Sequence, residues 1–181
     1  MPFVDFVYAL HLVESSQSLL ITFIRFNLVD SEYGSIFNSC EYITAREDDM
    51  KCTLFFDGAC RGNPGPMAIG AVLLENGKKV KELSENIGRG TNNIAEWNAL
   101  IGGLKLALAH GCRELEVKGD SQLVIRQISG KYQVKSENLI PLFNEAKKLC
   151  AKFEKINFKW VERENNSYTD GLSNKALDMK N

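Results

Sequence analysis

The fold of this 181-residue chain is decided by the stretch Thr53-Leu54-Phe55-Phe56-Asp57-Gly58-Ala59-Cys60-Arg61-Gly62-Asn63-Pro64-Gly65-Pro66. An apolar, strand-forming run ends on the carboxylate of Asp57, and a turn rich in glycine and proline follows at once. A carboxylate at the end of a buried strand is costly to desolvate unless an opposite charge compensates it. A metal ion is the simplest compensation, because divalent cations bind carboxylate oxygens. The stretch therefore predicts a central strand that carries one ligand of a metal site.

The rest of the chain from Met50 onward predicts alternating strands and helices. The expected strands are 51–57, 67–74, 80–87, 115–118 and 156–160, with an Asn76-Gly77 turn between the second and the third. The expected helices run from about 94 to 110, over a short segment ending near 129–130, from Ser136 onward, and from about 168 to 179. Strands joined by short turns pair antiparallel, and strands separated by helices pair in parallel. We therefore expect an α/β fold with a five-stranded mixed sheet, three antiparallel then two parallel strands, and helices on both faces.

Residues 1–49 differ in composition from the rest of the chain. They carry eight acidic and two basic residues, whereas residues 50–181 carry 15 acidic and 20 basic residues. Two apolar runs, 3–13 and 19–29, predict a β-hairpin, and Arg46-Glu47-Asp48-Asp49 is typical of a solvated acidic linker. We expect a domain at 50–181 and an N-terminal extension at 1–49. Two interpretations of the extension stay open, a native segment or a non-native one upstream of a natural start at Met50.

Composition excludes several classes of protein. The basic charge of residues 50–181 suits a polyanionic partner, although a merely solvated lysine-rich surface explains it equally well. No apolar run reaches the roughly 18–20 residues of a membrane span, and the N-terminus lacks the basic start of a signal peptide. The five cysteines are odd in number and form no C-x-x-C pair, and there are only two histidines. This pattern argues against a disulfide framework or a zinc site and for a reducing compartment. We expect a cytoplasmic protein and a monomer.

Four carboxylates stand at the ends of expected elements: Asp57, Glu96, Asp120 and Asp170. Each has a structural alternative, respectively an Asx turn, a capping box with Asn93, a helix N-cap and helix-dipole complementarity. Together, however, they fall at the carboxyl edge of the sheet, which is the usual ligand crevice of such folds. Four carboxylates at one crevice repel one another unless divalent cations bind, and a site made of oxygen ligands alone favours Mg²⁺ or Mn²⁺. Two such ions about 4 Å apart can activate a water and stabilise the leaving oxygen of a phosphodiester.

A series of segments resembles the type 1 ribonuclease H family, in its short, archaeal-like branch. The segments are Asp57 to Pro66 as quoted above, Thr91-Asn92-Asn93-Ile94-Ala95-Glu96-Trp97-Asn98-Ala99-Leu100, Gly119-Asp120-Ser121-Gln122-Leu123-Val124, Val161-Glu162-Arg163-Glu164-Asn165 and Asp170-Gly171-Leu172. The similarity covers Met50 to about Met179. It implies a ribonuclease H-like fold and cleavage of the RNA strand of RNA–DNA hybrids, with two Mg²⁺ or Mn²⁺ ions and with 5′-phosphate and 3′-hydroxyl products.

The resemblance also implies roles for individual residues. The metal-binding acids of the family match Asp57, Glu96, Asp120 and Asp170. Its hybrid-contacting positions match Gly58, Cys60, Asn63, Thr91, Asn92, Asn93 and Gln122, although turn and cap chemistry would place the same residue types in these loops. Many members carry a catalytic histidine in the loop before the last acid, and here Arg163 occupies that neighbourhood. The basic handle of some members is reduced to the short connection 130–135, so we expect weaker, salt-sensitive hybrid binding.

Three alternatives to the hybrid nuclease stay open. The first is a nucleic-acid-binding module of the same fold that does not cut, because fold alone does not imply function. The second is a nuclease of the same chemistry with broader substrates, such as double-stranded RNA. The third is a β-rich N-terminal adaptor whose partner sets the function. A separate hypothesis is that the acidic segment 1–49 folds back over the basic surface and competes with substrate.

Overall fold

The computed structural model describes residues 4–15, 18–29, 36–46 and 51–179, which belong to two compact units, Met1–Asp49 and Met50–Asn181. The first unit is a three-stranded antiparallel sheet in the order β1-β2-β3, formed by β1 (Val4–Ser15), β2 (Ser18–Val29) and β3 (Ile36–Arg46). Strand β3 was not expected, since Asn38, Ser39 and Glu41 interrupt its apolar pattern. Residues 47–49 of the expected linker lie outside the described residues.

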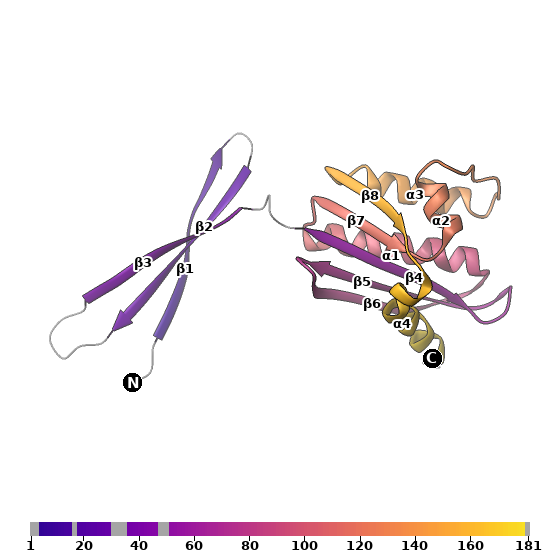
Figure 1. Cartoon of the computed structure of the whole chain (residues 1–181), viewed down its shortest axis with the longest axis horizontal. Helices are drawn as coiled ribbons and strands as arrows, with labels where there is room; N and C mark the ends of the chain where they lie inside the picture. The colour runs from indigo at the N-terminus through magenta and orange to yellow at the C-terminus, as the bar shows by residue number, and fades with distance from the viewer. Residues whose placement is uncertain (1–3, 16–17, 30–35, 47–50, 180–181) are drawn as a thin grey trace. The chain divides into compact units, whose positions relative to one another are not determined.

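The second unit contains a five-stranded mixed sheet, with β4 at its centre (Figure 1). The strands are β4 (Cys52–Cys60), β5 (Gly65–Glu75), β6 (Lys78–Gly90), β7 (Glu114–Gly119) and β8 (Lys155–Trp160). Their order is β6-β5-β4-β7-β8; β4, β5 and β6 pair antiparallel, and β4, β7 and β8 pair in parallel. The expected mixed sheet is confirmed. The parallel pairing places the carboxyl ends of β4 and β7 side by side.

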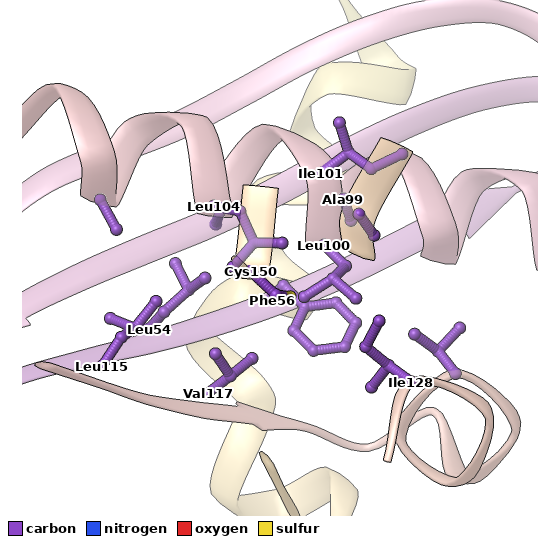
Figure 2. Packing of buried hydrophobic residues seen from close by; sticks show 14 of the residues in the cluster. Leu54, Phe56, Ala99, Leu100, Ile101, Leu104, Leu115, Val117, Ile128 and Cys150 are labelled. Atoms are coloured by element: carbon purple, nitrogen blue, oxygen red, sulfur yellow. The ribbon is translucent and has the colours of Figure 1, made fainter. Parts of the chain in front are cut away.

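Three helices bury one face of this sheet: α1 (Asn92–His110), α2 (Gln122–Ile128) and α3 (Ile140–Cys150). The core between them contains Leu54 and Phe56 from β4, Val117 from β7, and Leu100 and Leu104 from α1, all with no exposed surface (Figure 2). Side chains alternate along a strand, so residues 54 and 56 of β4 face these helices while residues 55 and 57 face the opposite side.

The opposite face carries α4 (Ser167–Asp178), which follows a short 3₁₀ turn at Arg163–Asn166. Helix α4 packs very close to β5, because a Cβ on Gly70 would lie 2.5 Å from the carbonyl oxygen of Thr169 and 2.8 Å from the backbone nitrogen of Ser173. Only glycine permits this approach. It brings the inward side of α4 within hydrogen-bonding reach of Asp57 on the neighbouring strand.

Two expectations are corrected by the structure. Helix α3 begins at Ile140 rather than at Ser136, because Pro141 has no backbone N–H and fits the first turn of a helix but not its interior. The expectation of no disulfide is wrong for one pair, since Cys52 at the start of β4 is bonded to Cys112 just before β7. Among the described residues, no helix has the length and apolar character needed to cross a bilayer.

Candidate active site

Asp57 lies within β4, which continues to Cys60, so its carboxylate projects from a strand and not from a turn. The side chain is only 5% exposed, and the hydroxyl of Ser173 on α4 donates a hydrogen bond to it. Burial raises the pKa of Asp57 from 3.8 to about 6, and the negative charges of Asp120 and Asp170 add to this effect, while the Ser173 hydrogen bond opposes it. Strand β4 thus presents a carboxylate that is hard to ionise without a cation nearby.

Glu96 lies one turn into α1 and points into the protein. The helix is capped by Thr91, whose hydroxyl oxygen accepts from the backbone N–H of Ile94 at 3.4 Å, so the alternative of a capping box between Asn93 and Glu96 is not found. One oxygen of Glu96, Oε2, is buried without a hydrogen-bond partner among the described residues. Burial, followed by the charges of Asp57 and Asp120, raises the pKa of Glu96 well above its usual value.

Helix α1 reaches this position because Gly58 has no side chain. A Cβ on Gly58 would lie 2.2 Å from the backbone nitrogen of Glu96 and 2.3 Å from the carbonyl carbon of Ala95. The contact is with backbone atoms, which cannot rotate away. Gly58 therefore sets the distance between the first turn of α1 and the strand that carries Asp57.

Asp120 directly follows β7, and Asn166 holds its carboxylate. The Nδ2 of Asn166 donates to Oδ1 of Asp120 at 2.7 Å and to the backbone carbonyl of Phe56 at 2.9 Å. The indole N–H of Trp160 donates to the backbone carbonyl of Asp120 at 3.0 Å. Helix α2 is capped at Ser121, without a side-chain hydrogen bond, so the alternative of an N-cap role for Asp120 is not found.

Asp170 lies in the first turn of α4, where the helix dipole favours an acid. Arg163 donates to its Oδ1 at 2.5 Å, and the amide of Asn174 donates to its Oδ2 at 3.1 Å. The Arg163 side chain is 72% exposed and that of Asp170 is 28% exposed. The guanidinium of Arg163 therefore approaches Asp170 from the solvent side.

The four acids line one polar cavity of about 190 Å³. Of the other predicted site residues, Gly58, Cys60, Asn92 and Arg163 also line it. Asn63 lies at the edge, where its Oδ1 accepts from the backbone N–H of Asn92 at 3.3 Å. The remaining three, Thr91, Asn93 and Gln122, are not among the lining residues, and Asn93 and Gln122 are exposed at the starts of α1 and α2.

The ligand atoms that this cavity offers fit a hard divalent cation. All four acids offer oxygen ligands, and Oε2 of Glu96 is a buried acceptor that lacks a donor. Within the described ranges, no three Asp, Glu, His or Cys side chains are arranged to hold a metal ion as they lie. The three aspartates instead accept hydrogen bonds from Ser173, Asn166 and Arg163. A cation that used Oδ1 of Asp170 would share this oxygen with Arg163 or displace it.

Sequence reasoning missed the polar residues that support the acids: Asn166, Thr169, Ser173 and Asn174. Asn166, Thr169 and Ser173 are at most 2% exposed. A signal was present, because these residues and Asp170 recur at three- and four-residue spacing, which places them along one face of a helix. A polar helix face packed on a sheet indicates a site rather than a core.

The sheet order, the single helix on one face and the acid-lined cavity define a ribonuclease H-like α/β domain. The family model described as "Reverse transcriptase-like" matches residues 55–176. The bifunctional protein Rv2228c of Mycobacterium tuberculosis is 43% identical over 131 residues, which are 71% of this chain and 36% of that protein. The ribonuclease HI of Halobacterium salinarum is 42% identical over 125 residues, which are 68% of this chain and 63% of that protein.

Solved structures agree with this match. The crystal structure of RNase H1 from Halobacterium salinarum has a TM-score of 0.70 and 40% identity, and the match covers 72% of this chain and 99% of that one. LC11-RNase H1, isolated from compost by a metagenomic approach and solved in complex with an RNA/DNA hybrid, has a TM-score of 0.67 and 36% identity, over 70% of this chain and 96% of that one. The chain belongs to the type 1 ribonuclease H family, as its sequence indicated. It spans less than two thirds of the Mycobacterium and Halobacterium relatives.

Proposed function

We propose that this protein is an endonuclease that hydrolyses the RNA strand of RNA–DNA hybrids with two Mg²⁺ or Mn²⁺ ions. The products would carry 5′-phosphate and 3′-hydroxyl ends. The observation that carries the proposal is the cavity of about 190 Å³ lined by Asp57, Glu96, Asp120 and Asp170. Family membership and the relative solved with an RNA/DNA hybrid support the choice of substrate.

The acids would bind the ions and orient them. Bound divalent cations would supply an activated water and stabilise the leaving oxygen of the scissile phosphodiester. Asp57 and Glu96, both less than a tenth exposed, would form the inner wall of the site, and Asp120 and Asp170 would form its open side. Arg163, more than two thirds exposed beside Asp170, is placed to neutralise a phosphate that enters or leaves.

The hybrid would lie across the loops at the carboxyl edge of the sheet. Gly58, Cys60 and Asn92 line the cavity, and Asn63 at its edge hydrogen-bonds the backbone of Asn92. Short polar side chains and exposed amides of this kind can approach a minor groove and contact the 2′-hydroxyls that distinguish RNA from DNA. The exposed side chains of Asn93 and Gln122, with Thr91 at the cap of α1, would extend the contact along the backbone.

Cleavage of a hybrid labelled on either strand tests the proposal directly. The purified protein is incubated with Mg²⁺, with Mn²⁺ and with chelator, and the products are resolved on a gel. We expect cuts in the RNA strand alone, and none with chelator. RNA duplex and DNA duplex in the same buffer measure how selective the enzyme is for hybrids.

Two variants separate catalysis from binding. Asp120→Asn and Asp57→Asn should abolish cleavage and leave hybrid binding measurable, because each removes one carboxylate charge without a change of shape. Full activity of both purified variants would refute the assignment of the acids. Binding of hybrid by the wild type without any metal-dependent product would instead favour a binding module of the same fold.

A further inference from the structure

We propose that Asn166 is a positioning residue, which holds the carboxylate of Asp120 in the orientation that the metal-dependent reaction needs. The inference rests on the proposed function but concerns a residue outside the four acids. Asn166 is 2% exposed and lies in the 3₁₀ turn before α4, distant in sequence from both of its partners. Its side chain bridges β4, which carries Asp57, and Asp120, which directly follows β7.

Both hydrogens of the Asn166 amide are used at the site. One hydrogen bond goes to the carbonyl oxygen of Phe56, the residue before Asp57, at 2.9 Å. The other goes to Oδ1 of Asp120 at 2.7 Å. An amide has two donor hydrogens, so Asn166 has none left for another acceptor. The side chain thus links the position of one acid-bearing strand to the rotamer of the acid on the next.

The two acceptors set the orientation of the amide, and Thr169 supports it. Its hydroxyl oxygen lies within hydrogen-bonding distance of both oxygens of Asn166, the backbone carbonyl at 2.8 Å and the side-chain Oδ1. The carbonyl of Phe56 and the carboxylate of Asp120 can only accept, so they require the Nδ2 end, and a flipped amide would place oxygen against oxygen. In this orientation Oδ1 faces Thr169 and can accept its one hydroxyl hydrogen. Thr169 is 1% exposed, so water does not compete for this contact.

A positioning role predicts an effect on cation binding itself. Partners that orient a metal-binding side chain typically change metal affinity by roughly 10- to 100-fold when they are removed. A merely structural role predicts a lower melting temperature with unchanged affinity in the fraction that is folded. The two roles therefore differ in a measurement that needs no substrate.

The test is Mn²⁺ binding by calorimetry to the full chain without nucleic acid, with the melting temperature measured in chelator. We expect Asn166→Ala to bind Mn²⁺ at least about tenfold more weakly than the wild type. In cleavage of the hybrid, the Mg²⁺ concentration for half-maximal rate should rise while the KM for hybrid stays unchanged. Excess Mg²⁺ should restore the rate of Asn166→Ala but not that of Asp120→Asn.

A matched pair at Thr169 keeps the test decisive if Asn166→Ala does not fold. Thr169→Ser retains the hydroxyl and should bind Mn²⁺ like the wild type, whereas Thr169→Val keeps the shape, loses the hydroxyl and should bind more weakly. Folded Asn166→Ala and Thr169→Val proteins with wild-type Mn²⁺ affinity would overturn the inference, as would a wild type that binds no Mn²⁺. Weakened Mn²⁺ binding in the variants of a protein that cuts no hybrid would support the inference and refute the proposed function alone.

Discussion

Replacing Asp57 with asparagine should stabilise the metal-free protein. Burial raises the pKa of Asp57 from 3.8 to about 6. A raised pKa means that folding favours the protonated form, so this residue's contribution to stability is fully present below about pH 4 and is lost as the pH rises through about 6. The difference of about 2 pKa units corresponds to about 3 kcal/mol at pH 8, at about 1.36 kcal/mol per unit.

Asp57→Asn removes the free-energy cost of ionising a buried carboxylate, and it weakens one hydrogen bond. The hydroxyl of Ser173 would donate to a neutral amide oxygen instead of a carboxylate, at a cost of about 1 kcal/mol. We therefore expect the variant to gain about 2 kcal/mol in the free energy of unfolding at pH 8 in chelator. At pH 5 the gain should shrink by about 1.5 kcal/mol, because Asp57 of the folded wild type is then largely protonated.

Urea unfolding at pH 8 and pH 5 measures the effect, first in chelator and then with Mg²⁺. Added Mg²⁺ should stabilise the wild type more than the variant, because the variant has lost one carboxylate ligand. Glu137→Gln removes an exposed carboxylate before α3 and serves as the control, with no expected change. A variant that is less stable than the wild type in chelator, or whose gain does not depend on pH, would refute the reasoning.

Four further predictions concern two glycines, the disulfide and the exposed Arg163. Gly58→Ala should destabilise the protein by more than about 2 kcal/mol in thermal unfolding, because its Cβ would lie 2.2 Å from a backbone nitrogen of α1. Gly171→Ala, with no atom within 4 Å of the new Cβ, should stabilise α4 by about 0.5–1 kcal/mol. Cys52→Ser should lower the free energy of unfolding, measured in urea, by about 4 kcal/mol, because the disulfide joins residues 60 apart. Reductant should lower the stability of the wild type and leave that of the variant unchanged. Arg163→Ala should change stability by less than about 1 kcal/mol, yet slow single-turnover hybrid cleavage by at least about tenfold; an unchanged rate would remove Arg163 from the mechanism.

The fold was predictable because its local signals agree with one another. The apolar run before Asp57 predicts the central strand, Asn76-Gly77 predicts the turn between β5 and β6, and Gly111 ends α1 in the left-handed conformation that glycine favours. The start of α3 was predicted too early because the predicted helix placed Pro141 beyond its first turn. The sequence of β3 did not indicate a strand, because the strand forms by antiparallel pairing with β2 and its apolar pattern is interrupted.

The acids of the site were predictable, but their partners were not. Asp120 follows a strand, Glu96 and Asp170 lie near the starts of helices, and Asp57 follows an apolar run within β4, and sequence reveals such positions. The partners depend on tertiary packing, as the hydroxyl of Ser173 is 116 residues from Asp57 and the amide of Asn166 is 110 residues from Phe56. The disulfide has the same origin, because β4 and the loop before β7 become neighbours only through parallel pairing.

The hydrogen-bond partners of the four acids support the proposed cation site. A structural acid in a protein with 22 lysines and arginines would be expected to gain a basic partner. Among the described residues that line the cavity, Arg163 is the single cation, and it lies on the exposed side. The buried acids face neutral donors or, at Oε2 of Glu96, no donor within the part of the chain that the structure describes. Folding therefore brings several carboxylates into one cavity at a cost in electrostatic repulsion and desolvation, which a bound divalent cation would offset. Binding of the ion that the proposed reaction requires would thus also stabilise this domain.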